Sequence, residues 1–317
     1  MRRTCAKFSS RACAQNALKR RISVKVEQIK DTVVISGLKD FDLEQTMECG
    51  QCFHFIKLGE NEYGISAYGR LLHAKQDKDS LCLYNTSIED FEKIWRRYFD
   101  LDRDYGEIKE FLIKGDKKLT EAVETMWGVR ILNQEFFETL ISFIISQNKQ
   151  IPHIKQIVAN ISKGYGEYLG EINGHEFYRF PTAKELSAAD EEALRACKTG
   201  FRAPYIWNAV QFVKDGILVE EELRSCDIEE CRNKLMQIKG VGMKVANCVS
   251  LFGLGHREAF PVDVWIKRIM EVLYFDGQER SNKEIEEYGV SRFGSYGGYA
   301  QQYLFYYGKT EKIGKRR

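Results

Sequence analysis

The sequence is poor in proline and has no long hydrophobic run. Only four of the 317 residues are proline, and each lies near the start of a run with helical periodicity: Pro152, Pro181, Pro204 and Pro261. Proline in these positions marks helix starts and does not break helices. No apolar stretch approaches the roughly 20 residues that cross a bilayer. We therefore expect a globular protein that does not enter a membrane, with enough chain for two domains or one large one.

The nine cysteines do not form a disulfide or metal-binding pattern. Cys49 and Cys52 have the spacing of half a zinc site, but no second pair with matching spacing follows them. No cysteine follows Cys248, which excludes an iron–sulfur loop of four cysteines at the C-terminal end. We expect free thiols in a reducing compartment and no metal site.

Positive charge is in only small excess, with a formal net charge of +2. If nucleic acid is a partner, local patches and backbone donors must therefore supply the binding. Residues 1–26 are the exception, because they contain no acidic residue. They fit a mitochondrial-type presequence, a basic arm near DNA, or an upstream start codon. We favour the last two because the segment lacks an amphipathic period, and we expect a disordered tail.

The hydrophobic period changes along the chain from that of strands to that of helices. Predicted strands cover residues 32–36, 52–56, 63–66, 71–74 and 81–84. Predicted helices cover residues 88–98, 118–126, 135–146, 152–161, 191–197, 205–213, 228–236, 243–254, 264–273 and 299–307. The predicted fold class is α+β. It has a small antiparallel sheet domain with a flanking helix at 27–115, packed beside an all-helical domain at 116–317.

A turn with two glycines, Lys239-Gly240-Val241-Gly242, connects two of the apolar helices. Glycine permits positive φ and a close approach to phosphate, and the amides that start the next helix can donate to that phosphate. For Gly-x-Gly alone, a glycine cap between packed helices is the commoner explanation. The longer pattern Leu-x-x-Ile-x-Gly-Val-Gly-x-Lys-x-Ala is more specific, and it favours a hairpin that binds DNA phosphate.

Lys244 and Asp263 are the candidate reactive groups. Lys244 lies in the first turn after the hairpin, on an apolar helix. Its amine either reaches water at the rim or sits in an apolar cleft, where it loses its proton readily and becomes nucleophilic. Asp263 opens another apolar helix and is a natural N-cap. The same carboxylate could face Lys244 and stabilise positive charge that develops on a sugar ring.

These motifs resemble those of the helix-hairpin-helix DNA glycosylases with a catalytic lysine, and more narrowly the 8-oxoguanine DNA glycosylases. Further matching segments occur in the same order: Gly50-Gln51-Cys52-Phe53, Ser146-Gln147-Asn148, Gly200-Phe201-Arg202-Ala203 and Gly298-Tyr299-Ala300-Gln301-Gln302-Tyr303-Leu304-Phe305. The resemblance covers roughly residues 30 to 307, and it is closer to a bacterial branch of the family than to the animal and yeast enzymes.

The resemblance implies an enzyme of base excision repair that flips 8-oxoguanine out of duplex DNA into a cleft. Lys244 would attack the sugar C1′ and form a Schiff base, which allows strand cleavage by β-elimination, while Asp263 would stabilise the charged sugar. The Gly50 carbonyl would accept a hydrogen bond from the N7–H that normal guanine lacks, a difference of about 1–3 kcal/mol. The remaining pocket residues implied are Cys248 and Phe305 on the faces of the base, Gln301 at its Watson–Crick edge, and Phe252.

On the opposite strand, the resemblance places Asn148 and Arg202 beside the unpaired cytosine and Phe201 as the wedge that fills the gap. The chain departs from the animal and yeast enzymes at three positions: His153 replaces an arginine, Phe201 a tyrosine and Trp265 a histidine. Neutral histidine offers one donor where arginine offers a fork. We therefore expect a weaker preference for cytosine opposite the lesion. Trp265 removes a possible phosphate donor or changes its geometry.

The resemblance implies no required cofactor and leaves open a monovalent cation at the hairpin carbonyls. The expected partner is double-stranded DNA containing oxidised guanine, bound by a monomer. The expected compartment is the bacterial cytoplasm, or the nucleus or mitochondrion of a eukaryote. Two alternatives remain open. One is a helix-hairpin-helix glycosylase for alkylated purines or oxidised pyrimidines. The other is a non-catalytic DNA-binding module, which would have no use for Asp263, Gln301 or the Gly50 segment.

Overall fold

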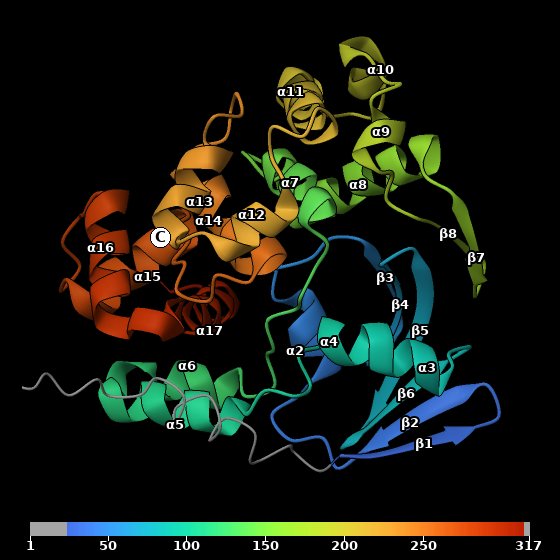
Figure 1. Ribbon diagram of the computed structural model, residues 1–317. Coiled ribbons are helices and arrows are strands. Elements are labelled where there is room, and N and C mark those ends of the chain that lie inside the picture. The colour runs from blue at the N-terminus through green and yellow to red at the C-terminus, as the bar shows by residue number, and fades with distance from the viewer. Residues whose placement is uncertain (1–23, 314–317) are drawn as a thin grey trace, which may run out of the picture.

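The computed structural model describes residues 24–313 and consists of a six-stranded sheet beside an assembly of helices (Figure 1). The strands are β1 Lys25–Ile29, β2 Thr32–Ser36, β3 Phe55–Gly59, β4 Glu62–Ala67, β5 Arg70–Asp77 and β6 Ser80–Tyr84. Their order in the sheet is β1-β2-β6-β5-β4-β3, and every neighbouring pair is antiparallel. The predicted α+β class, with an antiparallel sheet beside helices, is confirmed.

The observed strands differ from the predicted ones at the N-terminal end and at β3. β1 was not predicted because its sequence, KVEQI, has no regular alternation of apolar and polar residues. Almost all of its side chains are exposed, so no face of the strand has to be apolar. It includes Lys25 and Val26 of the tail expected at 1–26, and the rest of that tail up to Ser23 lies outside the described residues. β3 begins at Phe55, three residues later than predicted.

Helices account for most of the chain after the sheet. The α-helices are α2 Leu43–Glu48, α3 Ile88–Asp90, α4 Arg96–Tyr98, α5 Tyr105–Gly115, α6 Thr120–Thr125, α7 Phe136–Ile145, α8 Ile151–Tyr165, α9 Ala183–Leu186, α10 Glu191–Ala196, α11 Ala203–Lys214, α12 Glu220–Ser225, α13 Ile228–Leu235, α14 Met243–Val249, α15 Val264–Tyr274, α16 Asn282–Phe293 and α17 Gly297–Thr310. Short 3₁₀ or π turns join some of them: η1 Phe91–Trp95, η2 Lys117–Leu119, η3 Gly200–Arg202, η4 Ser250–Leu254 and η5 Gly294–Tyr296. In the described part of the chain, none of these helices combines the length and apolarity needed to cross a membrane.

The buried side chains form two hydrophobic cores. The first lies between the sheet and the α3–η1–α4 segment, where Val33, Leu83 and Trp95 are almost fully buried. The second fills the helical assembly and includes Ile108 and Leu112 of α5. α5 therefore packs with the helices, although it lies on the N-terminal side of the domain boundary predicted at 115/116. That boundary stays a prediction.

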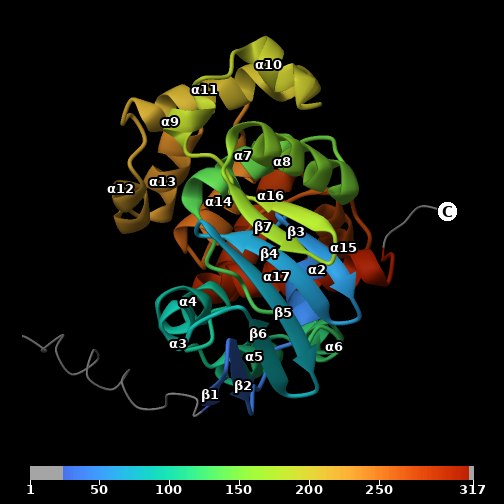
Figure 2. The same ribbon diagram turned by 90° about the vertical axis from the view of Figure 1, so that its right-hand side faces the viewer.

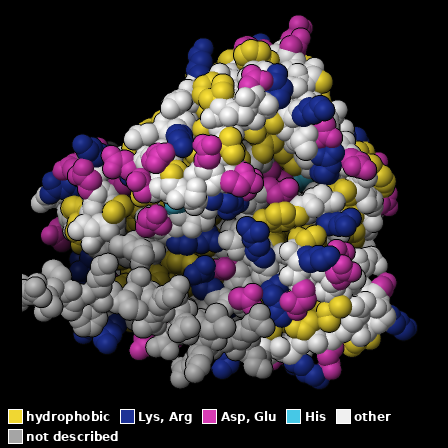
Figure 3. Space-filling model, viewed as in Figure 1, with side chains coloured by type: hydrophobic (Ala, Val, Ile, Leu, Met, Phe, Trp, Pro, Cys, Tyr) yellow, Lys and Arg dark blue, Asp and Glu magenta, His cyan; other side chains and the backbone are white. Residues whose placement is uncertain are grey.

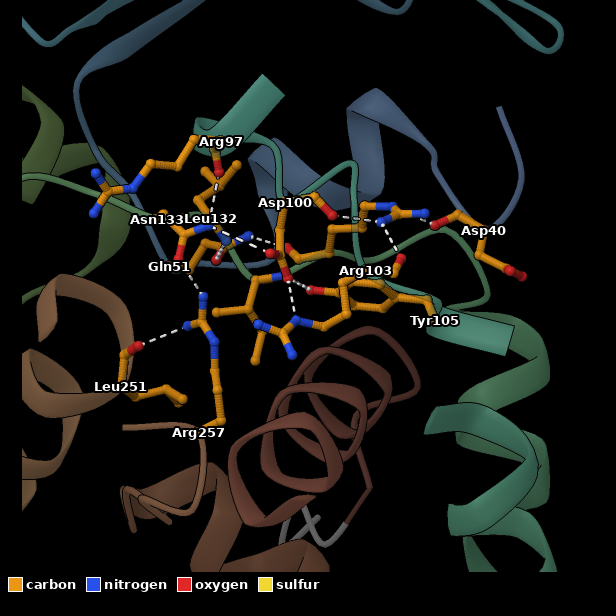
Figure 4. A network of polar contacts seen from close by, with 12 residues as sticks. Asp40, Gln51, Arg97, Asp100, Arg103, Tyr105, Leu132, Asn133, Leu251 and Arg257 are labelled. Carbon is orange, nitrogen blue, oxygen red and sulfur yellow. Dashed lines mark hydrogen bonds and ion pairs between the residues drawn. The ribbon is translucent and has the colours of Figure 1, made fainter. Parts of the chain in front are cut away.

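Arg130 joins the sheet domain to the segment that leads into the helices, and Figure 4 shows Asp40, Asp100 and Tyr105 of the same network. The side chain is 1% exposed, and its nitrogens donate to the carbonyls of Lys39, Asp40, Asp100 and Arg103 at 2.7–3.1 Å. The Tyr105 ring lies 4.4 Å from the guanidinium. A buried guanidinium is tolerated only when its donors are satisfied in this way. The network therefore fixes the path of the chain between the two cores.

A small hairpin of two strands, β7 Tyr168–Ile172 and β8 His175–Tyr178, extends from α8 to the sheet domain (Figure 2). Its turn consists of Asn173 and Gly174, both with positive φ, which is the backbone that an Asn-Gly hairpin turn requires. The Ser66 hydroxyl of β4 donates to the Tyr178 carbonyl at 3.0 Å. The hairpin was not predicted, although the Asn-Gly pair is a recognisable signal.

Candidate active site

The predicted hairpin is formed by α13, the turn at residues 236–242, and α14. Gly240 has a φ of +82°, and a Cβ there would lie 2.4 Å from the Tyr205 ring. Gly242 is the N-cap of α14 with a φ of −103°, and a Cβ there would meet open space. Val241 is buried, and its N–H donates to the Ile238 carbonyl at 3.0 Å. Gly240 is therefore required for packing, whereas Gly242 leaves the start of α14 open to an approaching group.

Lys244 lies one residue into α14, and its amine is held by two groups of α7. Lys244 Nζ donates to Ser146 Oγ at 3.1 Å and lies 5.1 Å from the centre of the Phe143 ring. Ser146 itself donates to the Phe143 carbonyl at 2.7 Å, which fixes the hydroxyl. The amine thus has a defined position at the edge of an apolar wall. No carboxylate of the described residues lies within 4.0 Å of it.

Asp263 is the N-cap of α15, as the sequence predicts. Its Oδ1 accepts hydrogen bonds from the N–H groups of Trp265 at 3.0 Å and Ile266 at 2.8 Å. Burial raises the pKa of the Asp263 carboxyl, and these two hydrogen bonds and the charge of Lys244 oppose the rise. The carboxylate is therefore fixed in orientation, and its charge interacts with that of Lys244 without direct contact.

Lys244 and Asp263 line one cavity of about 920 Å³. The cavity lies between the α7–α8 turn, the start of α14, one side of α15 and the segment from α15 to the start of α16, and Asn148 and Trp265 contribute to its wall. Figure 3 shows that acidic and basic side chains alternate over one face of the molecule, in keeping with its small net charge. The cavity brings the predicted nucleophile and its carboxylate together. A sugar between them would meet both groups.

Among the residues predicted for the damaged-base pocket, Phe305 lies against Gly50, and none of the predicted pocket residues lines this cavity. Gly50 has a φ of +83°, and a Cβ there would lie 3.1 Å from the Phe305 ring of α17. The ring therefore lies against the residue whose carbonyl is predicted to recognise the lesion. Cys248 and Phe252 are each 4% exposed, and Gln301 is 5% exposed.

Burial affects two polar groups of the predicted base pocket, the Cys248 thiol and the Gln301 amide. Burial raises the pKa of the Cys248 thiol to about 11, so the thiol is neutral at physiological pH. Gln301 Oε1 is buried and has no hydrogen-bond partner among the described residues. A buried amide oxygen without a partner costs free energy unless a ligand satisfies it. This feature fits the predicted contact of Gln301 with a base.

The residues predicted to face the opposite strand lie at the α7–α8 turn, in the first turn of α8 and in η3, and all but one are exposed. Asn148 and His153 are exposed, and Phe201 is 55% exposed. Arg202 is instead 2% exposed, and its guanidinium donates to the carbonyls of Gln147 and Thr199. In this structure its donors are therefore used internally, and its contact with cytosine stays a prediction.

Several residues that build the site were not assigned a role from the sequence. Phe143 underlies the Lys244 amine and stacks on Phe252, with ring centres 5.5 Å apart. Tyr205 contacts both the hairpin at Gly240 and the Phe201 ring, whose centre lies 6.3 Å away. Both are aromatic residues on apolar helices, so nothing in the local pattern separates them from ordinary core residues. Ser146 was recognised only as part of a matching segment.

Family profiles match nearly the whole described chain. The N-terminal domain of 8-oxoguanine DNA glycosylase matches residues 33–140, and the HhH-GPD superfamily of base excision DNA repair proteins matches residues 141–293. Among curated proteins, N-glycosylase/DNA lyase OGG1 of Arabidopsis thaliana is 32% identical over 284 residues, which are 84% of this chain and 77% of that protein.

Two solved structures are similar to this chain over nearly its whole length. The 8-oxoguanine glycosylase/lyase of Clostridium acetobutylicum, bound to double-stranded DNA with cytosine opposite 8-oxoguanine, is 39% identical. It superimposes with a TM-score of 0.88, over 91% of this chain and 99% of that one. MBOgg1, in complex with a low-affinity DNA ligand, is 43% identical with a TM-score of 0.88, over 92% of this chain and 100% of that one.

Proposed function

The chain belongs to the 8-oxoguanine DNA glycosylases of the HhH-GPD superfamily, and we propose that it excises 8-oxoguanine from duplex DNA and then cleaves the strand. The observation that carries the proposal is the shared cavity of Lys244 and Asp263 directly behind the hairpin turn. A DNA-binding module without catalysis needs the hairpin but has no use for this pair.

In the proposed reaction, Lys244 and Asp263 have different roles. The Lys244 amine attacks C1′ of the flipped nucleotide through its nitrogen lone pair, and the bond from C1′ to the base breaks with its electron pair leaving on the base. The new ammonium then loses a proton to become a secondary amine, and the released base takes up a proton. The Asp263 carboxylate stabilises the positive charge that develops on the sugar. The secondary amine then opens the sugar ring to a Schiff base, which makes the C2′ proton acidic. Loss of that proton expels the 3′ phosphate and cuts the strand.

Excision assays on several lesions test which damaged base the enzyme releases. Duplexes would carry 8-oxoguanine, an alkylated purine, an oxidised pyrimidine or no lesion, and both free base and cut strand would be measured under single-turnover conditions. The proposal expects free 8-oxoguanine and strand cleavage on the first duplex, with little reaction on the others. Faster excision of the alkylated purine or the oxidised pyrimidine would assign the chain to a different lesion.

We propose that the enzyme discriminates only weakly among bases opposite the lesion. His153 offers one donor where a second arginine would offer a fork, and Arg202 has its donors engaged with backbone carbonyls. Excision rates opposite cytosine, adenine, guanine and thymine are expected to agree within about tenfold. The charge-assisted hydrogen bond that is missing would itself favour cytosine by about 1.5–3 kcal/mol, or roughly 10- to 150-fold. A strong requirement for cytosine would contradict this, and His153→Arg should increase the preference for cytosine.

Three further properties are proposed from family membership. The reaction proceeds without a required cofactor, so excision should persist in EDTA, while a monovalent cation at the hairpin carbonyls would make DNA binding depend on which alkali metal ion is present. The protein acts as a monomer on double-stranded DNA containing oxidised guanine. It works in the bacterial cytoplasm, or in the nucleus or mitochondrion if the source is eukaryotic.

A further inference from the structure

Two side chains of α15 that the proposed chemistry does not use lie in the wall of the catalytic cavity. Trp265 and Arg268 are both half-buried there, on the helix that Asp263 caps. The Arg268 guanidinium lies 5.6 Å from the centre of the Trp265 ring, which is a cation–π arrangement. The indole therefore limits the positions that the guanidinium can adopt.

Arg268 is a cation without a carboxylate partner, in a wall where cations and acids are nearly balanced. The wall contains Lys149, Lys244, Lys267 and Arg268, and the acids Asp263, Glu271 and Glu279. The neighbouring Lys267 is neutralised, because its amine lies 3.2 Å from Glu279 and 3.6 Å from Glu271. Over residues 24–313, Arg268 makes no ion pair and no side-chain hydrogen bond. Its five N–H donors are thus available to an anion.

The start of α15 offers few free backbone donors to that anion. Helix N-terminal amides usually attract phosphate, but the N–H groups of Trp265 and Ile266 already donate to Asp263. The negative charge of Asp263 would also repel a phosphate placed on the helix axis. A side chain is therefore the better ligand for an anion at this end of the cavity, and on α15 Arg268 has free donors while Lys267 is paired. Lys149, the other wall cation without an ion pair among the described residues, belongs to the α7–α8 turn.

We propose that Trp265 and Arg268 form a phosphate-binding subsite at the mouth of the cavity. The indole holds the guanidinium toward the backbone of the lesion-bearing strand, where Arg268 contacts one phosphate next to the flipped nucleotide. This inference rests on the proposed function, since it takes the cavity to be the place that the flipped nucleotide enters. A fixed phosphate on one side sets the position of the sugar between Lys244 and Asp263. Trp265 is then a positioning residue that acts through Arg268.

The salt dependence of DNA binding tests the subsite without requiring catalysis. The probe is a duplex with a tetrahydrofuran abasic-site analogue, and Kd is measured at several KCl concentrations. Arg268→Ala should raise Kd by about tenfold, which corresponds to one charge-assisted hydrogen bond. It should also lower the slope of log Kd against log[KCl] by about one. Arg268→Lys should keep the slope, and the matched control Lys267→Ala should change neither quantity.

Two further measurements identify the partner of Arg268 and the part played by Trp265. Replacement of phosphates near the lesion by uncharged methylphosphonates, one at a time, should abolish the difference between wild type and Arg268→Ala at a single position. Trp265→Leu should weaken binding in the wild-type background and much less in the Arg268→Ala background, because the two residues are coupled.

The proposed subsite is contradicted if Arg268→Ala binds the probe with the wild-type Kd and salt slope, or if Lys267→Ala weakens binding as much as Arg268→Ala. It is also contradicted if no single methylphosphonate removes the difference in Kd between wild type and Arg268→Ala. Thermal unfolding of each variant checks that the fold is kept. If wild type binds the probe with the expected Arg268 effect but does not release 8-oxoguanine, the proposed function fails and the subsite stands.

Discussion

At the residue scale, Asp263 caps α15 and, under the proposed function, also supplies the charge that stabilises the sugar. Oδ1 accepts both hydrogen bonds that cap α15, and the carboxylate shares a cavity with Lys244. The cap needs only an oxygen acceptor, whereas stabilisation of a charged sugar needs a full negative charge. A substitution that keeps the acceptor and removes the charge separates the two roles.

Asp263→Asn is therefore expected to leave thermal stability nearly unchanged and to lower the single-turnover excision rate by about 10²–10³-fold. Because burial raises the pKa of Asp263, the wild-type rate should begin to fall with acidification at a pH above the ordinary aspartate range. Below that pH the protonated carboxyl gives no charge stabilisation, so the rates of wild type and variant should converge. A variant that retains the wild-type rate at neutral pH would remove the carboxylate from the mechanism.

At the element scale, the hairpin depends on its two glycines for different reasons. Gly240 has positive φ and lies against the Tyr205 ring, while Gly242 has ordinary φ and open space beside it. The turn is also held from α11, where Asn208 Oδ1 accepts a hydrogen bond from the Lys239 N–H at 2.8 Å. The hairpin is therefore supported by the same helix that follows Phe201, the predicted wedge residue.

Gly240→Ala is expected to lower the free energy of unfolding by about 2 kcal/mol, because the new Cβ is strained by its φ and overlaps an aromatic ring. Gly242→Ala is the matched control. Alanine caps a helix less well than glycine but meets open space here, so the loss should stay at or below about 1 kcal/mol. Urea denaturation of the two variants measures both values. Equal losses would mean that the turn does not need the left-handed backbone of Gly240.

Elements with a strong local signal were predicted, and those fixed by distant contacts were not. The hairpin, the α14 start and the α15 cap follow from glycine spacing and a capping aspartate, all of which are local. The α16 capping box of Ser281 and Glu284 is equally local and was overlooked. The burial of Arg202 could not be predicted, because its partners Gln147 and Thr199 come together only in the fold.

At the scale of the whole molecule, Glu135 connects the sheet to the helices. It is the N-cap residue of α7, and its Oε2 accepts a hydrogen bond from the Tyr68 N–H of the β4–β5 turn at 2.6 Å. Burial, and next the charge of Glu138, raise the pKa of Glu135 from its ordinary value of 4.5 to about 7. The folded protein therefore holds this proton to a higher pH than the unfolded chain does.

The free energy of unfolding should consequently decrease as pH rises from about 4.5 to about 7, and the loss should be complete above pH 7. Glu135→Gln keeps an acceptor for Tyr68 and has no proton to lose. We expect the variant to exceed wild type in stability by about 1–3 kcal/mol at pH 8, with the difference disappearing near pH 4.5. Urea denaturation at the two pH values measures it, and a pH-independent difference would show that charge is not the cause.

In the proposed mechanism, Lys244 is the residue that attacks the damaged nucleotide covalently. Borohydride reduction during reaction with 8-oxoguanine duplex converts a Schiff base into a stable protein–DNA adduct, which peptide mass spectrometry then locates. We expect an adduct on Lys244 in wild type, none in Lys244→Gln, and an undiminished adduct in Lys267→Gln, which lacks a different lysine of the same cavity wall. No adduct with wild type, or an adduct that persists in Lys244→Gln, would contradict it.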